Sequence, residues 1–225
     1  MMIQKKDLGT SISKNKWPNP DRLVFNGRYM HLEPLRPEHG QLLWPSVTEA
    51  EESFDYLRYG PFADVNDLTE LLDDLSNRAD QPFWLVTPKG SEPLGWLSIC
   101  DIYQQDSSIE IGSIWFSPKL QGSAASREAI FTLMKYVMDD LGYERLVWRC
   151  HAQNKNSFKA ALNLGFTHEG NWRNAAIVKG WQRDIAWFSI LKSEWLITKD
   201  KIEKWLAPDN FDPTGRQIKR LNEIK

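Results

Sequence analysis

One stretch constrains the fold most. Between residues 107 and 151, a strand-like segment is followed by a run of small residues, a long amphipathic pattern and a second strand-like segment. Ser123 is expected to cap the helix and Gly142 to end it. Because a helix separates the two strands, they are expected to be parallel neighbours, with the helix N-terminus at the carboxyl end of the first strand. The apolar stripe that predicts the helix consists of Ile130, Leu133, Met134, Val137, Met138 and Leu141.

The small residues "QGSAAS" (121–126) stand where that helix begins. A helix N-terminus carries unpaired N–H groups and a partial positive charge, so it can bind phosphates. Small side chains would let a pyrophosphate reach those amides. Close packing of the helix on the sheet is the alternative that the same residues allow, and the run alone does not decide between the two.

Periodicity along the rest of the chain predicts an α+β class. The expectation is a single domain with a mixed central sheet of about six to seven strands flanked by helices. The expected strands are 28–35, 82–88, 94–103, 107–117, 145–151, 166–180 and 183–191, of which the second to fourth form an antiparallel meander and the last two a hairpin. The expected helices are two short ones in 37–59, then 64–79, 123–141, 156–165 and 193–206.

The chain divides into three parts on this pattern. Residues 1–26 are polar, contain Pro18 and Pro20, and are expected to form an irregular N-terminal extension. Residues 27–191 would form the domain, and 192–225 a C-terminal helix and tail.

Charge and composition limit the classes of partner. Lys and Arg total 28 against 30 for Asp and Glu, so no basic excess indicates nucleic acid. No apolar run approaches 18 residues and no signal-peptide h-region opens the chain, so neither a membrane span nor secretion is expected. Cys100 and Cys150 lie singly in apolar strands, which favours a reduced, cytoplasmic protein. The His, Cys and Asp residues show no metal-ligand spacing, so no metal is expected.

Two motifs resemble those of the GNAT superfamily of acyl-CoA-dependent N-acetyltransferases. "QGSAAS" followed by "REA" resembles its pyrophosphate loop Q/R-x-x-G-x-G/A, with Ala124 in place of the first Gly and Ser126 at the second Gly/Ala position. "NKNSFKAALNLGF" (154–166) resembles the N-x-x-S/A…L-G-F signature. The resemblance covers roughly residues 27–191. "NGRYMHLEPLRPEH" and "RDIAWFSIL" look like the RimJ/RimL-type branch, which includes acetylases of ribosomal-protein N-termini.

The resemblance implies acetyl-CoA as co-substrate and an amine as acceptor. Residues 37–80 would form the acceptor wall, with Trp44, Tyr56, Tyr59, Asp64 and Asp67 able to receive a cationic amine. The residues expected to bind acetyl-CoA are Trp115, Phe116, Ser117, Gln121, Gly122, Ser123, Ala124, Ala125, Ser126, Arg127, Asn154 and Ser157.

Glu110 is the candidate base, because GNAT enzymes often use a glutamate on the strand before the loop. It stands eleven residues before Gln121, and strand alternation would place it on a face with Gly112 and Ile114. Partial burial there would raise its pKa. The alternative is a carboxylate that is simply solvated or ion-paired.

Ser157 is the candidate acid, because Ala161 occupies the position of the tyrosine that many GNAT enzymes use. Asn154 is expected to contact pantetheine, although both it and Ser157 also suit helix capping. Ala176 stands where certain RimL-type enzymes carry a glutamate. Asp184 is a second candidate base, with pairing to Arg183 or another arginine as the alternative.

The sequence therefore predicts an acetyl-CoA-dependent N-acetyltransferase that acts on a primary amine by direct transfer in a ternary complex. The amine would be a protein N-terminus or a small molecule. A non-catalytic acyl-CoA-binding sensor with the same fold is the alternative. A homodimer is a further expectation, supported by the apolar final helix with Trp195, Leu196, Ile202 and Trp205.

Overall fold

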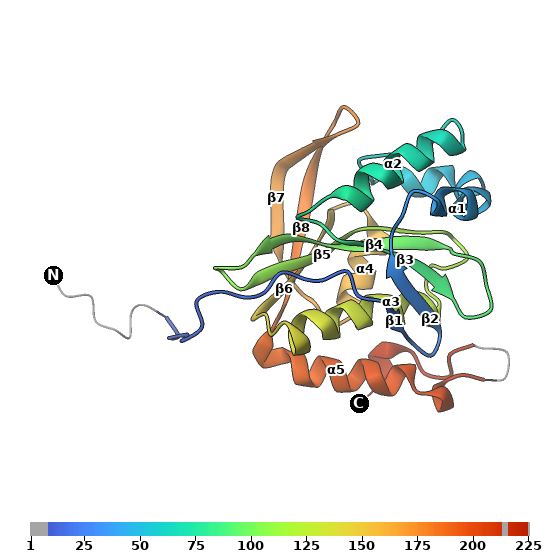
Figure 1. Cartoon of the computed structure of the whole chain (residues 1–225). Coiled ribbons are helices and arrows are strands. Elements are labelled where there is room, and N and C mark those ends of the chain that lie inside the picture. Colours follow the sequence, from blue (N-terminus) through green and yellow to red (C-terminus); the bar gives the residue numbers. More distant parts are fainter. Residues whose placement is uncertain (1–8, 213–215, 225) are drawn as a thin grey trace.

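The computed structural model describes residues 9–212 and 216–224 and contains one eight-stranded mixed sheet between two layers of helices (Figure 1). The strands run in the order β1-β2-β3-β4-β5-β6-β8-β7. They are β1 (Phe25–Asn26), β2 (Met30–Pro34), β3 (Phe83–Pro88), β4 (Gly95–Tyr103), β5 (Ser108–Phe116), β6 (Arg145–His151), β7 (Thr167–Val178) and β8 (Trp181–Leu191). The helices are α1 (His39–Thr48), α2 (Val65–Asn77), α3 (Ala124–Lys135), α4 (Lys155–Asn163) and α5 (Lys192–Leu206).

The sheet topology confirms the predicted α+β class. β5 and β6 are parallel, whereas the other neighbouring strands of the described chain pair antiparallel, including the β3-β4-β5 meander and the β7–β8 hairpin. The expected count of six to seven strands was too low. The eighth is β1, whose two residues pair with β2 through Phe25↔Leu32. A strand this short has no periodicity that a sequence can reveal.

Helix α3 begins and ends as its sequence predicts. The hydroxyl of Ser123 accepts a hydrogen bond from the amide of Ser126 at 3.1 Å, which caps the helix. The helix continues as a π-helical turn, Tyr136–Asp140, and Gly142 ends it with a φ of +71°. Its apolar stripe is buried in the core against the sheet, so packing rather than helix propensity holds it in place.

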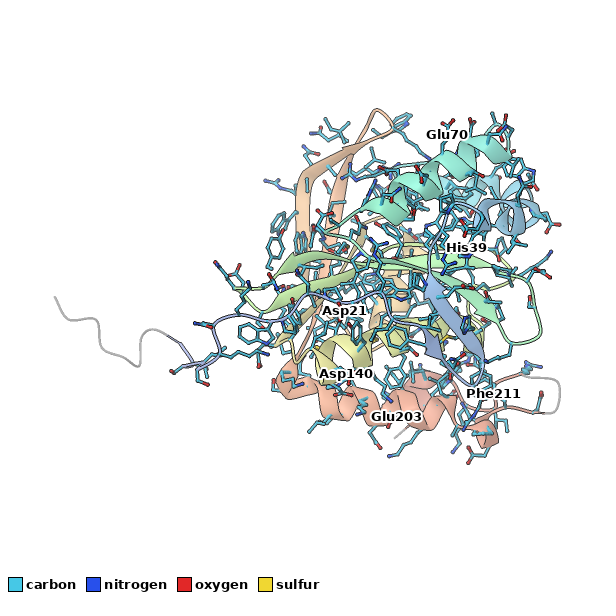
Figure 2. All side chains as sticks on the ribbon, in the orientation of Figure 1. Asp21, His39, Glu70, Asp140, Glu203 and Phe211 are labelled. Carbon is cyan, nitrogen blue, oxygen red and sulfur yellow. The ribbon has the colours of Figure 1, made fainter. Side chains whose placement is uncertain are left out.

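Two apolar cores lie on opposite faces of the sheet. One lies between the sheet and α3, α4 and α5, and the other between the sheet and α1 and α2. Figure 2 labels Glu70 on α2 and Glu203 on α5 at these opposite sides. Burying one large apolar side chain contributes about 1.5–3 kcal/mol, so both layers are firmly fixed.

The final helix packs on the first of these cores. Trp195, Ile202 and Trp205 are buried there, whereas Leu196 is 74% exposed. Three of the four residues that suggested a dimer surface therefore stabilise the monomer. The homodimer stays a prediction.

The described part of the N-terminal segment packs on the domain. Trp17 is buried, and its indole N–H donates to the carbonyl of Gly142 at 2.7 Å. The indole of Trp84 donates to the carbonyl of Leu23. The division into three parts stays a prediction, but residues 17–26 share contacts with the domain.

Within residues 9–212 and 216–224, no helix combines the length and apolar character that crossing a membrane requires.

Candidate active site

The central feature of the site is the parting of two parallel strands. β5 and β6 pair only over Ser108–Glu110, where Glu110 faces Val147. β5 continues to Phe116 and β6 to His151, and α3 and α4 begin shortly after these ends. The main chain beyond Glu110 is therefore free of strand pairing between β5 and β6, and two helix N-termini follow the open end of this gap.

A β-bulge at Ser113 changes the face of the residues that follow it. Ser113 has a φ of +49°, and β5 carries one extra residue between its pairings with Ser98 and Trp96. Ile114 consequently packs in the core beneath α3, not beside Glu110. The expected shared face of Glu110 and Ile114 was wrong, because simple alternation does not survive a bulge.

The loop before α3 presents unpaired main-chain donors. The first amides of a helix have no partner within it. Among the described residues, the amide of Ser126 is taken by the cap from Ser123, and the amide of Ser123 itself donates to the carbonyl of Leu120 at 3.2 Å. The amides of Ala124 and Ala125 stay available. Gly122 has a φ of +71° and open space around the position of a Cβ atom. Ala124 has a negative φ, so it needs no glycine. These residues fit a pyrophosphate.

The side chains of Trp115 and Phe116 belong to the two cores. The Trp115 ring stacks on Phe54 with centroids 5.1 Å apart, and its N–H donates to the hydroxyl of Ser53. Gln121 donates its side-chain N–H to the carbonyl of Phe116 at 2.9 Å, which closes the turn into the loop. Trp115 is thus left with only its main chain to offer a ligand.

Ser117 is buried and Arg127 is half-buried, and each has one side-chain polar atom with no partner among the described residues. The amide of Ser117 donates to the carbonyl of Leu94, while its hydroxyl has no partner among the described residues. The guanidinium of Arg127 lies 4.7 Å from the centre of the Trp205 ring, and burial lowers its pKa. Arg127 therefore packs toward α5 from the first turn of α3.

The N-terminus of α4 is capped by Asn154, whose side-chain oxygen accepts from the amide of Ser157 at 3.1 Å. The hydroxyl of Ser157 accepts from the indole N–H of Trp148 at 3.1 Å and keeps its own proton to donate. Cys150 lies nearby. Burial raises the pKa of its thiol, with the Ser157 hydroxyl acting to lower it and the charge of Glu110 to raise it. Asn154 therefore caps α4. Ser157 and Glu110 both influence the pKa of the Cys150 thiol.

Glu110 is 5% exposed and ion-paired with Arg149 across the strands. If Glu110 had a structural role alone, its carboxylate was expected to be either solvated or ion-paired. The structure shows the ion-paired arrangement. Burial raises the pKa of Glu110 well above its ordinary value, because the charged form loses hydration. A Cβ atom on Gly112 would lie 2.8 Å from the Glu110 carboxylate, so this glycine leaves the carboxylate its space.

Arg149 was not among the residues predicted for the site. Its Nη2 binds the carboxylate of Asp101, while its Nε binds that of Glu110. The signal was present: "RLVWRCH" alternates, so an arginine lies on the same face as the paired residue Val147. What the sequence lacks is the register between β5 and β6.

The side of the site where the acceptor was expected is bounded by the segment after α1. Lys179 donates to the carbonyl of Phe54 at 2.8 Å, and Arg183 donates to the carbonyls of Asp55 and Tyr56. The ring of Tyr56 lies 5.4 Å from the imidazole of His151. The β7–β8 hairpin thus holds this segment beside the open end of β6, a contact between distant parts of the chain that the sequence did not reveal.

Of the five residues expected in the acceptor wall, Tyr56 and Tyr59 reach the site. The hydroxyl of Tyr59 accepts from the indole of Trp96 and donates to the carbonyl of Ser113 at the bulge. Asp64 caps α2, and Asp67 accepts from the amide of Ala63. Trp44 is partly buried in the core beneath α1.

Asp184 has a structural partner that differs from the expected one. Its carboxylate accepts from the amide of Asn174 at 2.7 Å, which supports a bulge in β7. Among the described residues no ion pair links Asp184 to an arginine, and Arg183 instead binds the segment after α1. The expected pairing with Arg183 was wrong, because Arg183 reaches across to another element.

In residues 9–212 and 216–224, no three His, Cys, Asp or Glu residues are grouped so that they could hold a metal ion.

Comparison with known proteins decides the family. The model of the acetyltransferase (GNAT) domain matches residues 30–167. The chain belongs to the GNAT family of acetyltransferases. It is therefore an acetyltransferase, and acetyl-CoA is its co-substrate.

The similarity to one solved structure spans nearly the whole chain. A GCN5-related N-acetyltransferase from Brucella melitensis is 40% identical with a TM-score of 0.91, over 94% of this chain and 97% of that one. The "Uncharacterized N-acetyltransferase p20" of Bacillus licheniformis is 28% identical over 67% of this chain and 83% of its own. The "Putative ribosomal N-acetyltransferase YdaF" of Bacillus subtilis is 28% identical over 45% of this chain, which spans 55% of that protein.

Proposed function

We propose that this GNAT enzyme transfers the acetyl group of acetyl-CoA to a primary amine, namely a protein N-terminus, by direct transfer in a ternary complex. The observation that carries the proposal is the gap between β5 and β6. It has a buried carboxylate at its closed end and the N-termini of α3 and α4 following its open end.

The binding end is assigned to main-chain donors. The amides of Ala124 and Ala125 bind the pyrophosphate, and the unpaired main chain of β5 beyond Glu110 and the side chain of Asn154 hold the pantetheine arm. Acetyl-CoA supplies the thioester as an activated acetyl group. The small side chains of the loop keep bulk away from the phosphates.

The chemical step uses Glu110 and Ser157. Glu110 takes the proton of the amine, directly or through a water molecule, as the nitrogen–carbon bond forms and the carbon–sulfur bond breaks. The Ser157 hydroxyl donates its hydrogen bond to the departing sulfur, a role that its acceptance from Trp148 leaves open.

The two cysteines support direct transfer. Burial raises the pKa of both Cys100 and Cys150, so both are thiols rather than nucleophilic thiolates at neutral pH. A covalent acyl-enzyme formed on cysteine would need a thiolate.

A protein acceptor is favoured over a small amine by two observations. YdaF carries a ribosomal acetyltransferase name. The acceptor side is formed by a hairpin whose Trp172 and Trp181 are exposed, which suits a large partner better than an enclosed small molecule.

A thiol-release assay with a panel of amines tests the proposal. Peptides with a free N-terminus should turn over and gain one acetyl group by mass, whereas the same peptides with a blocked N-terminus should not. Turnover of polyamines alone would exclude the protein acceptor. Acetyl-CoA binding without turnover of any amine would favour the sensor.

A further inference from the structure

A single guanidinium joins two carboxylates from two strands. Arg149 on β6 binds Glu110 on β5 through Nε and Asp101 on β4 through Nη2. The two carboxylates differ in environment, since Glu110 has 7% of its side chain exposed and Asp101 has 38%. The arginine thus connects a buried acid to one that faces solvent.

The guanidinium is fixed by its surroundings as well. It lies 4.8 Å from the centre of the Trp187 ring, and Arg149 and Trp187 are opposite each other in the β6–β8 register. Asp101 has a φ of +44°, where a non-glycine residue is strained. This backbone conformation occurs at an irregularity in the β4–β5 pairing, beside the point where Asp101 meets Arg149.

Among the residues that the structure describes, few other charges act on Glu110. Cys100 is opposite it in the β4–β5 register, and Cys150 on β6 senses its charge. Both thiols are neutral, because burial raises their pKa. Arg58 acts on Arg149 by repulsion from a distance. Arg149 is therefore the cation in direct contact with Glu110, and Asp101 is the anion that competes for it.

We propose that Arg149 is a positioning residue that keeps Glu110 ionised and oriented, and that Asp101 limits how strongly it does so. The inference rests on the proposed role of Glu110 as base. Without a cation, a carboxyl this buried would hold its proton at neutral pH and accept none. If Arg149 were paired with Glu110 alone, the pKa of Glu110 would be low and the carboxylate would be a weak base. Sharing Arg149 between two carboxylates places Glu110 between these extremes.

The proposal predicts shifts of opposite sign. Arg149→Gln removes the positive charge, so the pKa of Glu110 rises and the acidic limb of the kcat/KM profile moves to higher pH, by about 1–3 units. Asp101→Asn removes the competing anion, so the limb moves to lower pH by a smaller amount. If these two residues merely stabilised the fold, the acidic limb would stay in place in both variants.

The chain offers a matched control in Arg145. It lies on the same strand and the same face as Arg149, and it binds Glu169 with both of its terminal nitrogens. Arg145→Gln breaks an equivalent arginine–glutamate pair without touching Glu110. The acidic limb should stay in place in this variant.

Two further measurements separate folding from electrostatics. Arg149→Lys keeps the positive charge but loses the guanidinium group that binds both carboxylates. The acidic limb of its kcat/KM profile should therefore lie between those of the wild type and Arg149→Gln. An infrared difference titration between the wild type and Glu110→Gln reports the ionisation of Glu110 without activity. Its midpoint should move upward when Arg149→Gln is introduced into both proteins.

The outcomes distinguish this inference from the proposed function. If Glu110→Gln is fully active, the base assignment itself is wrong and this inference is overturned with it. If Glu110→Gln is inactive but Arg149→Gln leaves both the limb and the infrared midpoint in place, the base stands and the role of Arg149 is refuted. Shifts of the same sign in Arg149→Gln and Asp101→Asn would refute the shared-cation arrangement.

Discussion

The two ends of the site are built from different groups. At the α3 end, the groups are main-chain amides and the contacts are local, as in the cap of Ser126 by Ser123. At the Glu110 end, the groups are side chains, and Arg149 contacts residues 39 and 48 positions away in the chain. A binding site for a phosphate needs only a helix end, whereas tuning a carboxylate needs charges from several strands.

Substitutions should therefore separate the two ends. Changes at the α3 end are expected to alter acetyl-CoA affinity, and changes at the Glu110 end to alter turnover. A variant that lowers both equally would show that the ends are one unit.

The largest effect is expected for Glu110→Gln, which keeps the shape of the side chain and removes its basicity. We expect kcat to fall by about 10²–10⁴-fold, the usual scale for loss of a general base. The acidic limb should flatten, while acetyl-CoA affinity stays the same. Thiol release measured across pH checks this. Normal turnover at neutral pH would leave Asp184 or water as the proton acceptor.

Next is Ala124→Asp, which places charge and bulk against the proposed pyrophosphate position. Acetyl-CoA should raise the melting temperature of the wild type in a concentration-dependent way and should no longer do so in this variant. Ala175→Asp makes the same change at an exposed position of β7 and should keep the shift. An undiminished shift in Ala124→Asp would mean that the small residues serve packing alone.

Ser157→Ala should slow turnover by about 10²-fold, at the lower end for acid catalysis because water can also supply a proton. Acetyl-CoA affinity should change little. The variant also leaves the Trp148 indole without an acceptor, at a cost of about 1–3 kcal/mol in unfolding free energy. Denaturation and kinetics on the same samples separate these effects. Full activity per folded molecule would leave Ser157 a purely structural residue.

The smallest effects compare one glycine from each end. Gly112→Ala would bring a methyl group 2.8 Å from the Glu110 carboxylate and 2.9 Å from the Cys100 sulfur, so it should lower both kcat and stability, the latter by about 1–3 kcal/mol. Gly122→Ala meets no atom but keeps a φ of +71°, so it should cost about 1 kcal/mol of stability and little kcat. Equal effects on kcat would contradict the division into two ends.

Much of the fold followed from periodicity. The amphipathic stripe of α3, its cap at Ser123 and its end at Gly142 are set by residues near one another, and all three were predicted. The parallel β5–β6 pair followed from the length of the crossover. The two-residue β1 did not, because two residues carry no pattern.

Only part of the candidate site could be predicted from the sequence. Glu110, Ser157 and the loop were named from motifs, and they stay predictions as functional residues. Arg149, Asp101 and the partner of Asp184 were missed or misassigned. Each of those depends on which strand is adjacent and in which register, and a bulge such as that at Ser113 shifts the register by one residue.

The sequence by itself determined the order of strands and helices, the cap of α3 and the small-residue loop, because these depend on backbone preferences within a few residues. Only the tertiary structure decided how deeply Glu110 is buried, that it shares Arg149 with Asp101, and that Ile114 faces away from it. Burial and ion pairing are properties of neighbours in space. Here those neighbours come from β4, β5 and β6, which are brought together only when the sheet forms.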